Sequence, residues 1–293
     1  MQIVILSARP EAGSNRRLVE AASAVGIGVN LVNATQATAD SAGGLYLGAE
    51  AVLERASDVV LARVGNWRPD SILAMLEVMT AGAVATPNPA PAIRIGRDHW
   101  RTAQVLSAAG LPVPTTIAGA DPEALAAAAK QRLGFPVVVK QRRSRMGVGV
   151  IRCQSPDHLE AVLDSLWRVG DEIVVQQYLD TGGCSLRLLV VGSRVVAAAR
   201  FEAAAPEWRS NAARGGTVAD LIPDPETIEL AVAATRSIGL GICGVDLLPT
   251  RDGTMIGEVN PTPGFVNLEK ATGVDVAGAI VAHLAALATK PQD

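Results

Sequence analysis

The sequence carries no large excess of charge of either sign. Its 26 lysines and arginines stand against 29 aspartates and glutamates, a net charge of -3. Such a chain has no general electrostatic attraction for nucleic acid or for an anionic membrane, so we expect neither as a partner. Its three cysteines, Cys153, Cys184 and Cys243, form no CxxC pair and have no histidine at metal spacing. We therefore expect free, buried or half-buried thiols.

Signal and membrane-spanning segments are also missing from the sequence. The start, "MQIVILSARPEAG", has no basic region before its short apolar run, which predicts a first β-strand and not a signal peptide. The apolar stretch 276–288 contains His283 and is too short to span a bilayer. With 49% hydrophobic residues over 293 positions, we expect a folded cytoplasmic protein of two or three subdomains.

Strand-like and helix-like segments alternate through about the first ninety residues. This order predicts a small parallel α/β unit. No GxGxxG opens its first helix, which excludes the usual dinucleotide fingerprint. The prolines of "ATPNPAPAI" then break the pattern before the helix "GRDHWRTAQVLSAAG", and they indicate a domain boundary.

The remaining chain contains three predicted hairpins. "PVVVK" and "GVGVIRC" flank a loop whose arginines, Arg142, Arg143 and Arg145, give it a basic and mobile tip. "LRLLVVGSRVVAAARFE" forms two strands around Gly192-Ser193, a dipeptide suited to a tight turn. "GVDLLPT" and "TMIGEVN" are joined by the turn "RDG", which lets them pair antiparallel.

The third hairpin places polar residues where a buried strand would carry apolar ones. Period-2 alternation puts Glu258 and Asn260 on one face, and Asp246 of the first strand can join that face. Two carboxylates and an amide oxygen are hard ligands that suit magnesium. The alternative is that both carboxylates are simply exposed on the solvent face of the hairpin and that Asn260 makes the turn.

Other residues have the chemistry of a phosphate site. Lys140 ends a strand and reaches a phosphate as a point charge, while Gly147 and Gly149 let backbone N–H groups approach phosphate oxygens. A solvated basic loop is the alternative, because no Walker A sequence is present. Arg187, on a strand, presents a planar fork suited to carboxylate or phosphate, or to a structural ion pair.

These motifs, in this order, resemble the ATP-grasp superfamily and specifically its RimK-type α-L-glutamate ligases. The matching segments are "RDHWRTAQVLSAAGLPVP", "GFPVVVK" with "GVGV", "VVQQYL", "LRLLVVGSRVVAA", "RSNAARGG", "GVDLL" and "GEVNPTPGFVNLEKATGVDVAGAI". The resemblance covers roughly residues 90 to 285. It implies an α/β (α+β) class, an ATP-grasp fold preceded by a parallel α/β domain, with domains at 1–92, 93–174 and 175–293.

The resemblance also implies a role for each matching residue. Arg187 and Arg214 would face the reacting acyl phosphate, and Asp246, Glu258 and Asn260 would bind Mg²⁺ or Mn²⁺. The residues implied for ATP are His99, Lys140, Gly147, Gly149, Gln177, Tyr178, Ser185, Arg209, Ser210 and Asn211.

Three of these positions depart from the family pattern. His99 stands where the family usually has a lysine, so a permanent charge becomes a group only partly protonated near neutral pH. Ser185 replaces an aspartate associated with the ribose, and a serine cannot accept two hydrogen bonds as a carboxylate does. Gln177 replaces a frequent glutamate at the hinge, a milder change.

The implied activity is ATP-dependent ligation of an amino acid, glutamate by family, to a carboxylate acceptor through an acyl phosphate. The acceptor is a cofactor tail or a protein C-terminus, and the weak argument from net charge favours cofactor biosynthesis. We expect a homo-oligomer, as in related ligases. The rival hypothesis, prompted by His99 and Ser185, is an impaired ATP-grasp protein that binds nucleotide or acts as a scaffold. A D-alanine or carbamoyl-type ligase is disfavoured by "EKATGVDVAGAI".

Overall fold

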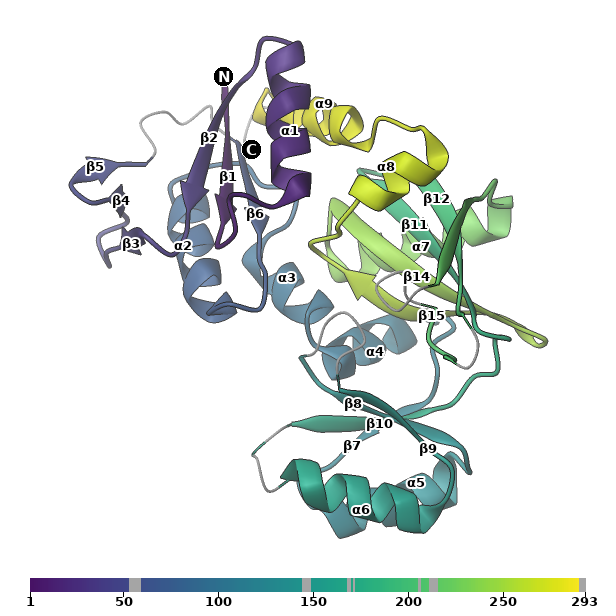
Figure 1. Ribbon diagram of the computed structural model, residues 1–293. Coiled ribbons are helices and arrows are strands. Elements are labelled where there is room, and N and C mark those ends of the chain that lie inside the picture. The colour runs from purple at the N-terminus through teal and green to yellow at the C-terminus, as the bar shows by residue number, and fades with distance from the viewer. Residues whose placement is uncertain are drawn as a thin grey trace.

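The computed structural model of the chain describes residues 1–52, 59–143, 149–167, 170, 172–204, 207–210 and 216–289. Its first unit is the predicted parallel α/β unit, at the upper left of Figure 1. The central strand β1 pairs with β2 and with β6, both in parallel. The main elements are β1 (Gln2–Ser7), α1 (Gly13–Ala24), β2 (Gly28–Asn33), β6 (Val59–Arg63) and α2 (Pro69–Ala81).

Between β2 and β6 the chain forms a second, smaller sheet that the sequence did not predict. Strands β3 (Ala37–Ala39), β4 (Leu45–Leu47) and β5 (Glu50–Ala51) pair antiparallel. Their shortness explains why alternation gives no usable signal there, since two or three residues define no period.

The proline-rich segment contains a helix as well as the predicted break. Helix α3 (Ala90–Gly96) begins directly after Pro89 and has Pro91 in its first turn. Proline is accepted there because its missing N–H would have no helical partner in any case. The predicted boundary at residues 92 and 93 therefore falls inside a helix.

The second unit is an antiparallel sheet with two helices on one face, at the bottom of Figure 1. Its strand order is β7-β10-β8-β9, and β8 and β9 form the first predicted hairpin. Helix α4 lies between this sheet and the rest of the molecule (Figure 1). The elements are α4 (His99–Ala108), β7 (Thr116–Ala118), α5 (Pro122–Arg132), β8 (Val137–Gln141), β9 (Val150–Cys153), α6 (Pro156–Trp167) and β10 (Ile173–Gln177).

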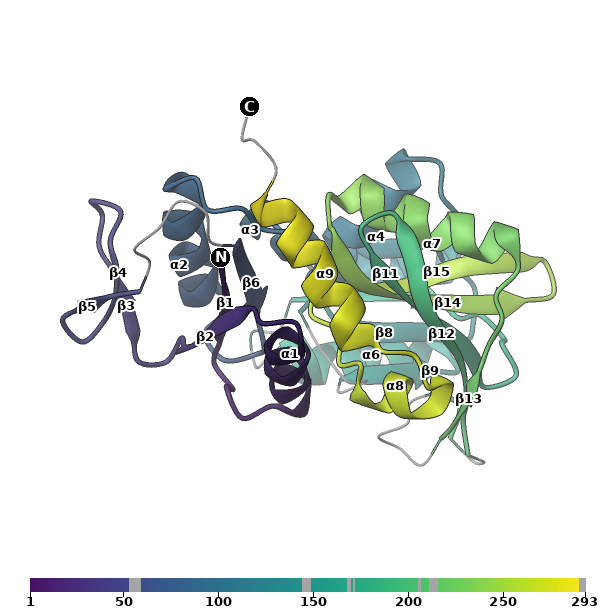
Figure 2. The ribbon, with the colours of Figure 1, turned by 90° about the horizontal axis from the view of Figure 1, so that it is seen from above.

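The third unit is a five-stranded antiparallel sheet of order β13-β12-β11-β14-β15. Buried residues of α7 pack on one of its faces, and those of α8 and α9 pack on the other. Figure 2 shows α9 between this sheet and the parallel α/β unit. The elements are β11 (Cys184–Val191), β12 (Arg194–Glu202), β13 (Thr217–Asp220), α7 (Pro225–Ile238), β14 (Ile242–Thr250), β15 (Gly253–Asn260), α8 (Val266–Thr272) and α9 (Val276–Ala288).

One irregularity in this sheet decides which residues share a face. From Thr250 opposite Gly253 to Leu247 opposite Ile256 the pairing of β14 with β15 is regular. It then shifts by one residue, so that Asp246 faces Glu258 and Gly257 is the extra residue of a β-bulge. A Cβ at Gly257 would lie 2.8 Å from Leu248 Cγ, which explains the glycine.

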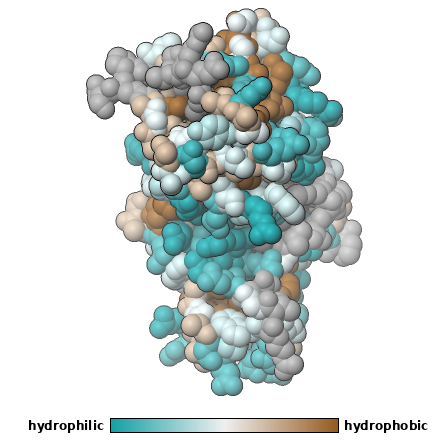
Figure 3. Space-filling view, turned by 90° about the vertical axis from the view of Figure 1, so that its left-hand side faces the viewer, coloured by the Kyte–Doolittle hydropathy of each residue, from teal (hydrophilic) through white to brown (hydrophobic). Residues whose placement is uncertain are grey.

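The cysteines, the helices and the visible surface bear on the expectations from the sequence. All three cysteines are free and buried, as expected. In the described part of the chain no single helix is long and apolar enough to cross a membrane; α8 and α9 meet that test only together, bent by 119°. On the face shown in Figure 3, hydrophilic side chains predominate over the middle and lower parts.

Candidate active site

Three charged residues form one row across the five-stranded sheet. Arg187 on β11 is the Cα partner of Asp246 on β14, and Asp246 is the partner of Glu258 on β15. Arg187 donates from Nε to Asp246 Oδ1 over 2.6 Å and from Nη2 to Oδ2 over 2.5 Å. The charge of Asp246 raises the pKa of the guanidinium further above its ordinary value. An arginine implied for the acyl phosphate and a carboxylate implied for the metal are thus ion-paired with each other here.

Asn260 lies on the same face as Glu258, two residues further along β15. Its Oδ1 accepts a hydrogen bond from the Thr262 N–H over 2.9 Å, which turns the chain at the end of the strand. The buried amide of Asn88 holds the following residue, because its Nδ2 donates to the Pro261 carbonyl over 3.0 Å. Asn88 Oδ1 also accepts from the N–H of Gly241 and Ile242. Asn88 therefore fixes the loop that follows the implied metal ligands.

Lys140 faces this row from the other sheet. Its Nζ donates to Gln176 Oε1 over 2.7 Å. Burial lowers the pKa of the Lys140 ammonium, and the charges of Glu258 and Asp246 offset part of that shift. The structure thus brings together four residues from separate motifs, and it adds Gln176, which the sequence did not single out.

His99, at the first position of α4, is not partly protonated as the sequence predicted. Burial lowers its pKa to about 3, and the charge of Lys140 lowers it too, against the opposing effect of Asp98. The imidazole is therefore neutral near pH 7. His99 therefore does not supply the positive charge of the lysine that the family usually has at this position.

The base of the predicted mobile loop is anchored. Arg142 forms a two-pronged ion pair with Asp98, with Nη2 2.6 Å from Oδ2 and Nε 3.2 Å from Oδ1. Asp98, 2% exposed, also caps α4 by accepting from the N–H of Trp100 and Arg101. The expectation that Arg142 adds its positive charge to the tip of the loop is wrong, because Arg142 directly follows β8 and its charge is paired with Asp98 at the start of α4. Arg145 lies outside the described residues.

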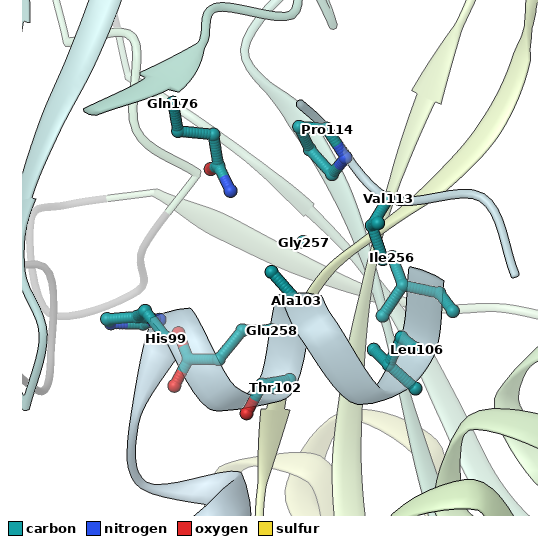
Figure 4. A pocket seen from close by; sticks show the side chains of 10 residues that line it. All are labelled: His99, Thr102, Ala103, Leu106, Val113, Pro114, Gln176, Ile256, Gly257 and Glu258. Carbon is teal, nitrogen blue, oxygen red and sulfur yellow. The ribbon is translucent and has the colours of Figure 1, made fainter. Parts of the chain in front are cut away.

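A small pocket lies beside these groups, between α4, β10 and β15. It is narrow, with room for about one water molecule. Figure 4 shows His99, Thr102 and Glu258 at one end, and Leu106, Val113 and Ile256 at the other. The pocket is therefore apolar at one end and carries a neutral imidazole and a carboxylate at the other.

The implied hinge residues contact a cluster that bridges the two sheets. The Gln177 N–H donates to the Thr115 carbonyl over 2.8 Å. Tyr178 accepts from Arg152 Nη1 at 3.2 Å and meets Trp208 edge to face, with ring centroids 5.9 Å apart. Arg152 lies over both rings. Trp208 therefore packs against the hinge.

Arg209 and Ser210 come from the segment implied for the nucleotide phosphates. Arg209 pairs with Glu207 at 2.8 Å and donates from Nη1 to the Val150 carbonyl over 3.0 Å, which joins this segment to β9. Ser210 Oγ donates to Ser185 Oγ over 2.6 Å, so two residues from separate motifs meet.

Gly149 has a φ of +71°, and a Cβ there would lie 2.8 Å from Gln141 Oε1, so the position favours glycine. Gly147, Asn211 and Arg214 lie outside the described residues.

The residues present fit a hard divalent cation. Asp246, Glu258 and Asn260 offer carboxylate and amide oxygens on one face of two paired strands. Among the described residues no group of three or more His, Cys, Asp or Glu side chains has metal-binding geometry. A three-ligand site at Asp246 and Glu258 therefore needs the amide oxygen of Asn260 as its third ligand. Arg187 and Lys140 place cations beside these oxygens, an arrangement suited to a bound polyphosphate.

Two antiparallel sheets with these charged residues between them are the arrangement of the ATP-grasp fold. The RimK-like ATP-grasp domain model matches residues 96–284. The chain belongs to the RimK-like ATP-grasp family, and it is an ATP-dependent ligase.

Curated relatives and solved structures are similar to this chain over nearly its whole length. The probable alpha-L-glutamate ligase of Marinomonas sp. (strain MWYL1) is 34% identical over 289 residues, covering 97% of this chain and 95% of the relative. The RimK domain protein ATP-grasp from Sphaerobacter thermophilus DSM 20745 superposes with a TM-score of 0.74 at 25% identity, covering 97% and 99%. The D-cycloserine synthetase DcsG gives a TM-score of 0.74 at 21% identity, covering 99% and 100%.

Proposed function

We propose that this ligase joins the amino group of glutamate to a carboxylate acceptor through an acyl phosphate, with release of ADP and phosphate. The relatives named probable alpha-L-glutamate ligase support glutamate as the amino acid. The acceptor we propose is a small-molecule cofactor tail or a protein C-terminus. We also propose cytoplasmic location and assembly as a homo-oligomer.

One observation carries the proposal. Arg187, Asp246 and Glu258 are consecutive partners on β11, β14 and β15, and the charges of the two carboxylates reach Lys140 on the opposite sheet. Phosphoryl transfer from ATP to a carboxylate needs little covalent chemistry from the protein; it needs positioning and charge stabilisation. A row of one guanidinium and two carboxylates that faces a lysine supplies both.

Asp246, Glu258 and Asn260 are the residues that would hold Mg²⁺. Bound there, the ion would neutralise charge on the phosphates of ATP. Mn²⁺ satisfies the same oxygen ligands, and we propose it as a substitute.

The chain's own residues perform the remaining tasks. Lys140, held by Gln176, directs its ammonium to a phosphate, and Arg187 stabilises the acyl phosphate oxygens with its planar fork. The guanidinium of Arg187, which pairs with Asp246 here, would bind an anionic substrate group with the same planar fork. The bridge between Arg209 and β9 holds the two sheets together around the nucleotide. We assign Gly147, Asn211 and Arg214 to the same site from their motifs.

Purified protein with ATP, Mg²⁺, L-glutamate and a panel of carboxylate acceptors tests the proposal. ADP release and product mass are measured. Glutamate- and acceptor-dependent release should fall at least about a hundredfold in Glu258→Gln. The control Glu160→Gln, on the exposed face of α6, should retain full activity. ATP binding without ADP formation for every acceptor would favour the nucleotide-binding or scaffolding alternative, which the neutral His99 makes worth testing.

A further inference from the structure

Two buried side-chain oxygens, Asn15 Oδ1 and Thr262 Oγ1, accept and donate no hydrogen bond within the described part of the chain. Asn15 is 1% exposed. Burial without a partner costs free energy, so such atoms call for a water or a ligand. The orientation of the Asn15 amide is fixed, because its Nδ2 donates to Ser7 Oγ over 3.1 Å and to the Arg9 carbonyl over 2.9 Å.

Both oxygens lie at the carboxyl edge of the parallel sheet. Ser7 and Arg63 end β1 and β6, and they are Cα partners. Asn15 bonds to Ser7 on one side. On the other side, Arg63 Nη2 donates to the Pro263 carbonyl over 2.9 Å, and Pro263 follows Thr262 in the chain. Ligands of open α/β sheets bind outside the carboxyl ends of the strands, which is this edge.

The same loop continues from the implied metal site. The Thr262 N–H donates to Asn260 Oδ1 over 2.9 Å. Four residues, 260–263, thus lead from the charged row of the five-stranded sheet to Arg63 of the parallel sheet. A small molecule bound at this edge lies next to the reacting groups.

The chemistry of the edge selects the ligand. Asn15 Oδ1 accepts an N–H, the Thr262 hydroxyl donates to an oxygen, and Arg63 adds a permanent positive charge that favours a carboxylate. A single small molecule with both an amino and a carboxylate group matches this set. We propose that the main-chain amino and carboxylate groups of the incoming amino acid bind between Asn15 and Thr262. This inference rests on the proposed ligase function.

Thr262→Val is the decisive variant, because it removes only the hydroxyl and keeps the shape of the side chain. Binding of L-glutamate is measured by calorimetry with Mg²⁺ and a non-hydrolysable ATP analogue, so that turnover is not required. The Kd should rise about tenfold or more, as expected for loss of a hydrogen bond to a charged group. Thr262→Ser, which keeps the hydroxyl, should bind like the parent.

The matched control is Thr80→Val in α2, a half-buried threonine whose hydroxyl bonds to the Leu76 carbonyl. It should leave the Kd for L-glutamate unchanged. In steady-state assays Thr262→Val should raise KM for L-glutamate and leave KM for ATP unchanged, a split that a purely structural role would not produce. Should the valine prevent folding, Thr262→Ala tests the same loss.

An unchanged Kd in Thr262→Val, with the parent active on L-glutamate, would overturn this inference and leave the proposed function intact; the two oxygens would then hold an ordered water only. A parent that releases ADP with acceptor alone and binds no amino acid would overturn both.

Discussion

Arg187 and Asp246 lie opposite each other on adjacent strands and form a two-pronged ion pair with N–O distances of 2.6 and 2.5 Å. Each is the other's partner, although the family resemblance implies an anionic substrate for one and a cation for the other. The pair compensates the charges of a partly buried arginine and a partly buried carboxylate.

The first prediction concerns the carboxylate of this pair. Asp246→Asn keeps the size of the side chain but removes its charge, which should raise the Mg²⁺ concentration for half-maximal ADP release by at least about tenfold. A magnesium titration at saturating ATP measures this. Asp252→Asn, in the exposed turn between β14 and β15, is the control and should titrate like the parent. Identical titrations for both variants would remove Asp246 from the metal site.

The second prediction concerns the arginine. Arg187→Lys retains a positive charge but loses the planar fork, so kcat should fall about a hundredfold while KM for ATP changes little. Steady-state kinetics with ATP varied measure both constants. Arg194→Lys, at the exposed start of β12, is the control for replacing an arginine by a lysine, and it should leave both constants unchanged. A rise in KM for ATP at unchanged kcat would instead assign Arg187 to nucleotide binding.

Two neighbouring arginines give a matched test of the anchor at Asp98. Arg142→Met leaves a 2%-exposed carboxylate without its two-pronged partner and should destabilise the fold by about 3 kcal/mol. Arg143, whose Nε is 4.0 Å from the same carboxylate and whose side chain is 58% exposed, should cost less than about 1 kcal/mol when changed to Met. Urea denaturation measures both values. Equal losses would contradict the role given to Arg142.

His99 predicts a pH dependence of stability. Its pKa is about 3 in the folded chain against 6.5 as the ordinary value. Between these values the unfolded chain binds a proton that the folded chain does not, so the free energy of unfolding falls as pH is lowered from 6.5 towards 3. Well above pH 6.5 both states hold a neutral imidazole, and this group contributes nothing to the slope.

Melting temperatures measured between pH 7.5 and 4.5, without Mg²⁺ or nucleotide, check this. His99→Gln should flatten the decline, whereas His158→Gln, at an exposed position on α6, should not. Parallel curves for the parent and His99→Gln would show that His99 takes up its proton in the folded state as well.

Local patterns of the sequence were enough to predict the hairpins. The turn at Gly192-Ser193 lies between β11 and β12 where alternation and turn chemistry agree, and the arrangement of β14 and β15 was found in the same way. The short β3, β4 and β5 were missed because they are too brief to show a period.

Less of the site could be predicted from the sequence, because the contacts that support it join residues far apart in the chain. Asp98 and Arg142 are 44 residues apart, and Lys140 and Gln176 are 36 apart. Neither pair has a local pattern that would reveal it. Burial of the His99 imidazole, together with the charge of Lys140, likewise lowers its pKa, and no property of the segment "RDHW" contains that information.

The bulge at Gly257 has a consequence for how this site tolerates change. Continued from the turn without the bulge, the pairing would place Glu258 opposite Val245, whose side chain belongs to the core beneath α7. Pairing Gly257 as an ordinary strand residue would thus turn both Glu258 and Asn260 away from Asp246 while leaving every ligand in the sequence, whereas deleting Gly257 together with the bulge would keep Glu258 opposite Asp246. The metal-binding face therefore depends on the bulge that takes Gly257 out of the pairing as much as on the identity of the ligands, and a comparison that aligns only the identities would overlook its loss.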